Sequence, residues 1–272
     1  MHSLRSSWLF LLYCFCCLKA FFSTQNRIGA CFLLWNGVEY WAQRDVIALM
    51  NDIITTACKF VTSSIGRKII VALTGSCLLL FLVGHLAGNL TIFGGDVADG
   101  GTSWINHYAT GLHSMPAWLL WSIRLGLLAV ALVHIVLTLV LKYENYNART
   151  HYRKENTLKA TLSSRTMVIT GIMILCFAVF HLWQLTFNGD PHDCYNHIIA
   201  AFQDPMCSLF YIVAICCLFM HVRHGLQSVL QTFGLATRKV RPLYNIVAYL
   251  FGIAVCGGFI AIPVCVMLGI LK

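Results

Sequence analysis

Residues 69–93 read IIVALTGSCLLLFLVGHLAGNLTIF and contain no lysine, arginine, aspartate or glutamate. An uncharged apolar run of this length crosses the roughly 30 Å hydrocarbon core of a bilayer as one helix. Four more such spans are expected, at about 117–141, 167–187, 206–233 and 243–271. In the last of them, Pro263 is expected to kink the helix without ending it. The sequence therefore predicts an all-α membrane protein, a bundle of five transmembrane helices.

The composition excludes the common alternatives to a membrane protein. The chain is 58% hydrophobic and 11% charged, whereas soluble domains carry about 25% charged residues. Its net charge of +9 resides in the segments before the first span, between the second and third, and between the fourth and fifth. The other two connections have aspartates and no lysine or arginine. The positive-inside rule therefore places the basic segments in the cytoplasm and the C-terminus outside, and no nucleic-acid partner is expected.

Residues 1–49 do not fit this plan. Their apolar run at 8–22 is interrupted by Lys19 and is shorter than a span, which is typical of a signal-peptide core. Met50 stands just before the first basic cluster. We interpret 1–49 as an N-terminal extension, either signal-like or outside the translated protein, and 50–272 as the five-span unit.

Histidines are unusually frequent, with eleven against ten aspartates and glutamates together. Ionisable side chains inside spans are rare and usually functional. The first four expected spans contain one histidine each as a candidate metal ligand: His85, His134, His181 and His221.

Their depths divide these histidines into two pairs. His85 and His181 lie 17 and 16 residues after the basic residues that open their spans, about 24–26 Å from the cytoplasmic edge. His134 lies eight residues before the basic end of its span, and His221 lies 17 residues after the aspartate that precedes its own. Both of these fall in the cytoplasmic half.

Two imidazoles at one depth on different helices suit the two axial positions of a haem iron. The spacing thus predicts an outer haem on His85 and His181 and a cytoplasmic-side haem on His134 and His221. His224 is the rival of His221, since it follows by three residues on nearly the same helix face. Zinc fits poorly because each level offers two ligands. A histidine relay for protons is the alternative.

Five short motifs carry a resemblance to a known family. They are SSIGRK at 63–68, ALTG at 72–75, HLAGNL at 85–90, HVRHGLQS at 221–228 and QTFG at 231–234. Together they resemble the di-haem cytochrome b subunit, the five-helix membrane anchor of bacterial succinate dehydrogenases and quinol:fumarate reductases.

The resemblance implies a set of cofactors and partners. It implies two haem b groups on the same histidine pairs, and menaquinone or ubiquinone in the membrane. It also implies an FAD-containing flavoprotein and an iron–sulfur subunit on the cytoplasmic side of the bacterial inner membrane. The anchor would then contribute electron transfer and a quinone site rather than succinate chemistry.

One departure from the family bears on the direction of the reaction. Some fumarate-reducing members have a glutamate in the fourth span just before the ligand histidine, where this chain has Leu218, Phe219 and Met220. We therefore expect the anchor of a succinate dehydrogenase. The alternatives are the cytochrome b anchor of a fumarate reductase, or that of a hydrogenase or formate dehydrogenase.

Further polar residues are candidates for binding quinone or the propionates of the haems. A quinol site on the outer side needs a proton partner, for which His107, Asp96 and Asp99 are candidates. Arg124 lies in the second span, ten residues before His134. It is a candidate hydrogen-bond donor to a quinone carbonyl or counter-charge for a haem propionate. The alternative is that its side chain snorkels to the lipid headgroups. Arg67 and Lys68 are the propionate candidates at the cytoplasmic side.

Overall fold

The computed structural model describes residues 37–95, 103–149, 162–235, 237 and 239–272. In these ranges the chain forms helices and no strand. The helices are α2 (Gly37–Thr62), α3 (Ser64–Asn89), η3 (Leu90–Gly94), α4 (Trp104–His113), α5 (Ala117–Arg149), α6 (Leu162–His181), η5 (Leu182–Phe187), α7 (Cys194–Gln203), α8 (Pro205–Thr232) and α9 (Arg241–Met267). Two compact units divide the chain, Met1–Lys59 and Phe60–Lys272.

The first unit is described only from Gly37 onward, by helix α2. The apolar run at 8–22 lies outside the described residues. Helix α2 passes through position 50 without interruption, and the boundary between the two units follows Lys59. The interpretation of 1–49 as a separate extension stays a prediction.

The expectation of an all-α chain with five spans is confirmed. In the described part of the chain, five helices are long and apolar enough to cross a membrane. They are Ser64–Gly94, Ala117–Asn147, Thr166–Phe187, Pro205–Thr232 and Arg241–Met267. Several extend past the apolar runs because a helix continues into charged residues at the membrane edge. Pro263 lies inside α9, which runs on to Met267.

Local capping explains where the spans begin and end. The Ser63 hydroxyl accepts a hydrogen bond from the Gly66 N–H at 2.9 Å and starts α3. The Asp204 carboxylate does the same for α8, accepting from the Met206 N–H at 3.0 Å. Gly234 has a φ of 73° just after α8, the left-handed conformation that terminates helices and that glycine adopts without strain.

Two short helices, α4 and α7, close one end of the bundle where loops were expected. A buried cluster joins them to the spans and comprises Ile92, Ile105, Ile198, Ile199, Phe202, Tyr211, Ile262 and Val266. The Asn106 Oδ1 of α4 accepts from the Tyr195 N–H of α7 at 2.7 Å. We call this the cap end. The opposite end, which contains Arg67 in the first turn of α3 and the last turn of α8, is the basic end.

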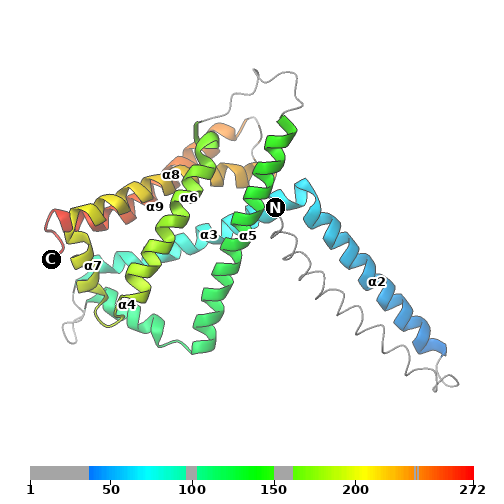
Figure 1. The fold of residues 1–272 in the computed structure, drawn as a ribbon, viewed down its shortest axis with the longest axis horizontal. Coiled ribbons are helices and arrows are strands. Elements are labelled where there is room, and N and C mark those ends of the chain that lie inside the picture. The colour runs from blue at the N-terminus through cyan, green and yellow to red at the C-terminus, as the bar shows by residue number, and fades with distance from the viewer. Residues whose placement is uncertain (1–36, 96–102, 150–161, 236, 238) are drawn as a thin grey trace, which may run out of the picture. The chain divides into compact units, whose positions relative to one another are not determined.

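Helix α8 is the centre of the bundle. It packs against α9, α6, α3 and α7, and Figure 1 shows α8 and α9 side by side. Helix α5 packs chiefly against α3. The histidine-bearing helices therefore meet as two close pairs, α3 with α5 and α6 with α8, which the contact of α3 with α8 joins.

Candidate functional site

The rings of His85 on α3 and His181 on α6 lie together near the cap end. Their centroids are 5.8 Å apart and their planes stand at 87°. Since a metal ion lies about 2 Å from an imidazole nitrogen, one ion between two rings needs centroids roughly 6 Å apart. The spacing of this pair fits that requirement.

Aromatic side chains surround the pair. Phe81 stacks on His85 with centroids 5.4 Å apart, and Phe259 of α9 lies 5.8 Å from the same ring. Phe177 lies 5.6 Å from His181. Such walls exclude water and strengthen polar contacts inside the site.

Polar side chains also contact both rings of this pair. The Tyr211 hydroxyl lies 3.3 Å from Nδ1 of His181 and donates to Gln184 Oε1 at 2.8 Å. The Asn89 amide nitrogen donates to the His85 carbonyl at 2.7 Å and lies 3.4 Å from each ring nitrogen of His85. The two rings therefore have chemically different neighbours.

The other two histidines, His134 on α5 and His221 on α8, lie near enough to interact electrostatically. His134 Nδ1 is 3.2 Å from the Thr74 hydroxyl of α3. His221 Nδ1 is 3.3 Å from the Thr170 hydroxyl of α6. Thr74 precedes His85 by eleven residues, so the two pairs lie about 16 Å apart along α3.

A glycine beside each threonine lets these rings approach. A Cβ at Gly75 would lie 3.1 Å from His134 Cε1, and a Cβ at Gly171 would lie 3.3 Å from His221 Cε1. Both distances are tighter than ordinary van der Waals contact, so a side chain there would displace the imidazole. These glycines keep His134 and His221 against α3 and α6.

These contacts reveal a repeat that the sequence reasoning missed. Thr-Gly precedes a histidine by eleven residues in both α3 and α6, as Thr74-Gly75 before His85 and Thr170-Gly171 before His181. After each of these spans comes a ten-residue helix, α4 or α7, with Asn-His at its third and fourth positions. The next span, α5 or α8, then contains the second ligand candidate of that half. We call 64–149 the first half and 162–232 the second half.

The donor set fits two bis-histidine haems better than a metal cluster. Each pair offers one imidazole from each half. Among the described residues, no three histidine, cysteine or acidic side chains gather as a metal site. Two nitrogen ligands at each level match the axial needs of haem iron and fall short of a tetrahedral zinc site.

His224 lies one turn beyond His221 on α8 and interacts with it electrostatically. The ring that contacts Thr170 and Gly171 is that of His221.

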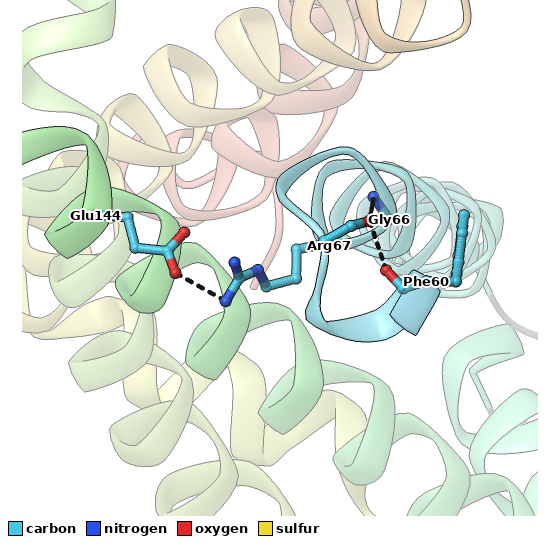
Figure 2. A network of polar contacts seen from close by, with 5 residues as sticks. Phe60, Gly66, Arg67 and Glu144 are labelled. Atoms are coloured by element: carbon cyan, nitrogen blue, oxygen red, sulfur yellow. Dashed lines mark hydrogen bonds and ion pairs between the residues drawn. The ribbon is translucent and has the colours of Figure 1, made fainter. Parts of the chain in front are cut away.

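The two basic residues at the start of α3 have different surroundings. Arg67 forms an ion pair with Glu144 of α5 at 2.8 Å, shown in Figure 2. Their side chains are 18% and 39% exposed. Lys68 lies on the wall of a cavity of about 420 Å³ between α3 and the end of α8, lined by Ile65, Lys68, Ile69, Ser228, Gln231 and Thr232.

The candidates for quinone lie at the cap end or outside the described residues. His107 is exposed on α4, with its ring 5.9 Å from that of Trp104. The Arg124 guanidinium is 3.5 Å from His113 Nε2 and 5.6 Å from the Trp121 ring. These contacts direct Arg124 toward the cap end. Asp96 and Asp99 lie outside the described residues.

Comparison with known proteins connects this geometry to a family. The model of the succinate dehydrogenase/fumarate reductase transmembrane subunit matches residues 142–260. The resemblance drawn from the short motifs is thereby confirmed. No curated protein and no solved structure matches the chain. The family match and the five spans make this chain a multi-pass membrane protein.

The match covers the second half and most of α9. It includes His181 and His221, and it leaves His85 and His134 outside. The repeat of Thr-Gly and histidine extends the same pattern to the first half.

Proposed function

We propose that this chain, whose residues 142–260 match the succinate dehydrogenase/fumarate reductase transmembrane subunits, is the haem-containing anchor of a succinate dehydrogenase. In this role it passes electrons between an iron–sulfur subunit and membrane quinone. The observation that carries the proposal is the contact of the His85 and His181 rings from the two halves, with His134 and His221 placed at a second level beside Thr74 and Thr170.

In this proposal, His85 and His181 hold a haem b at the cap end, and His134 and His221 hold a second at the basic end. A haem held by two histidines would supply one-electron transfer when bound. The chain's own residues orient the four imidazoles and exclude water with aromatic rings. They also set the two levels about 16 Å apart along α3.

We assign the propionates of the haem at the basic end to Lys68. Its cavity combines one ammonium group with the hydroxyls of Ser228 and Thr232 and the amide of Gln231. Such donors compensate carboxylates that would otherwise be costly in a low-dielectric site. Arg67 is a weaker assignment, since Glu144 already neutralises its charge.

The quinone site is proposed at the cap end, with menaquinone or ubiquinone as substrate. His107 is exposed there and is able to accept a proton from a quinol. Arg124 is the nearby cation and is able to donate to a quinone carbonyl. Asp96 and Asp99 stay candidates from the sequence.

The direction of the reaction is inferred from α8. Leu218, Phe219 and Met220 precede His221, so this stretch of the helix offers no carboxylate for protons crossing the membrane. This favours succinate oxidation over fumarate reduction. The proposed complex has a flavoprotein and an iron–sulfur subunit on the cytoplasmic side of a bacterial inner membrane.

The test is a reduced-minus-oxidised spectrum of the purified protein with haem quantification. We expect two haems b per chain. One haem should be lost in each of His85→Ala, His134→Ala, His181→Ala and His221→Ala. His224→Ala, the matched control on α8, should keep both. A wild-type chain without haem would end the proposal.

Co-purification in mild detergent separates this function from the hydrogenase and formate dehydrogenase anchors. A succinate dehydrogenase anchor should bring down a flavoprotein together with an iron–sulfur protein. Recovery of a hydrogenase or formate dehydrogenase subunit instead would favour the alternative.

A further inference from the structure

Three of the four intramembrane histidines have a hydroxyl oxygen next to Nδ1. The Thr74 hydroxyl lies 3.2 Å from Nδ1 of His134, and the Thr170 hydroxyl lies 3.3 Å from Nδ1 of His221. The Tyr211 hydroxyl lies 3.3 Å from Nδ1 of His181. Each hydroxyl comes from a different helix than its histidine.

The two threonine hydroxyls have their single proton engaged elsewhere. Thr74 Oγ1 donates to the Ile70 carbonyl at 2.8 Å. Thr170 Oγ1 donates to the Met167 carbonyl at 3.0 Å. Since a hydroxyl has one proton and two lone pairs, what remains for the histidine is a lone pair. The ring nitrogen facing it must then be the donor, and the neighbouring backbone carbonyl, Val71 for His134 and Met167 for His221, is a second acceptor for the ring.

Tyr211 is engaged in the same way. It donates to Gln184 Oε1 at 2.8 Å. Gln184 is held in place, because its amide nitrogen contacts Cys207 Sγ at 3.4 Å and its carbonyl lies 3.1 Å from His197 Nε2. The Tyr211 oxygen therefore also offers a lone pair to His181.

An imidazole that donates through Nδ1 has its free lone pair on Nε2, the nitrogen available to a metal. We propose that Thr74, Thr170 and Tyr211 are positioning residues that fix His134, His221 and His181 in the Nδ1–H tautomer, so that each presents Nε2 to a haem iron. This inference rests on the proposed function. The hydrogen bond also makes the imidazole a more basic ligand, which favours ferric over ferrous iron.

His85 lacks this arrangement among its described contacts. Its polar neighbour is the Asn89 amide nitrogen, whose position is set by a 2.7 Å bond to the His85 carbonyl. An amide N–H is a donor, so it cannot accept a proton from the ring. The haem at the cap end would therefore be held by one imidazole with an oxygen acceptor beside Nδ1, His181, and by one without such an acceptor among its described contacts, His85.

The test is a redox titration of each haem in the purified holo-complex, with haem per chain measured alongside. Thr74→Val and Thr170→Val remove a hydroxyl with little change of shape. We expect the midpoint potential of the haem at the basic end to rise by the equivalent of about tenfold, close to 59 mV for one electron. Thr74→Ser and Thr170→Ser keep the hydroxyl and should restore the wild-type potential.

Thr138→Val is the matched control on α5. Thr138 donates to the His134 carbonyl at 2.8 Å, one turn away, and its hydroxyl has no ring nitrogen among its described contacts. Valine variants at 74 and 170 that titrate like Thr138→Val would overturn the inference. So would loss of haem in the serine and valine variants alike, because the cause would then be shape. A wild-type complex without haem would instead defeat the proposed function.

Tyr211→Phe should change the other haem alone. It removes the acceptor at His181, so the potential of the haem at the cap end should rise while that of the other haem stays. Tyr195→Phe is the control, since that hydroxyl donates to the Lys272 carbonyl on the outer side. Equal potentials in Tyr211→Phe and Tyr195→Phe would contradict the role of Tyr211.

Discussion

The two halves of the bundle agree closely at the basic end and differ at the cap end. At the basic end, threonine and glycine from one span contact the histidine of the next in both halves, at 3.2 Å and 3.3 Å. At the cap end, His181 has a tyrosine hydroxyl beside it, whereas His85 has an amide. The repeated unit thus sets where the imidazoles lie, and residues particular to each half set their chemistry.

The same contrast extends to the short helices at the cap end. His107 and His197 occupy equivalent positions in α4 and α7. His197 Nε2 lies 3.1 Å from the Gln184 carbonyl, while His107 is exposed beside Trp104. In the second half this histidine therefore contacts the end of a span, whereas in the first half it is exposed.

The largest expected effect tests whether each site is shared between the halves. The double variant His85→Ala/His181→Ala removes both members of one pair and should retain one haem per chain. The double variant His85→Ala/His134→Ala takes one member from each pair and should retain none. Haem quantification of the purified proteins distinguishes them. If the first double variant lost both haems, the pairing across halves would be wrong.

A smaller effect is expected from filling the glycines at the basic end. Gly75→Val and Gly171→Val place a branched side chain against His134 and His221. Each variant should bind less haem per chain at the basic end than the wild type. The two losses should be similar, because the Cβ distances are 3.1 Å and 3.3 Å. Haem per chain and thermal stability in detergent measure this.

The control for the glycines is Gly257→Val on α9, where an added Cβ meets nothing within 4 Å. Full haem content in all three variants would mean that the glycines have no role in holding the rings.

The smallest effect concerns the ion pair of Arg67 and Glu144, which ties α3 to α5 in the first half. Glu144→Gln should lower the free energy of unfolding by less than about 1 kcal/mol, because Glu144 is 39% exposed and water screens the pair. A double-mutant cycle with Arg67→Met, read by thermal denaturation, isolates the interaction. A much larger coupling would indicate that the first half depends on this contact for its fold.

The spans could be predicted because the bilayer imposes a long apolar helix on the sequence. The expected run at 117–141 and the observed Ala117–Asn147 begin at the same residue. Helices α4 and α7 could not be found in this way, since ten residues are too few for a span and aspartate and glycine flank them. Their stability comes from packing into a buried cluster that includes Ile262 and Val266 of α9, which lie far along the chain.

Only part of the candidate site could be predicted from the sequence. Counting residues from charged edges grouped His85 with His181, and the structure brings these rings together. Thr74, Thr170 and Tyr211 were missed because their role depends on contacts between helices. The repeated Thr-Gly eleven residues before a histidine was the available signal for the threonines. For Tyr211 no signal existed, because its partner Gln184 lies 27 residues away.

The turns that follow α3 and α6 decide how the halves fit at the cap end. η3 is a 3₁₀-helix, wound more tightly than an α-helix, whereas η5 is a π-helix, wound more loosely. The chain is therefore wound by a different angle per residue after α3 than after α6. Asn106 of the first half accepts from the Tyr195 N–H, while the equivalent Asn196 donates to Asp193 of its own half at 2.7 Å.

The contact between the two short helices is thus heterologous, not the isologous interface of a symmetric dimer. The two halves share one sequence pattern, but they contribute different groups to this contact, the Asn106 side chain from one and the Tyr195 backbone from the other.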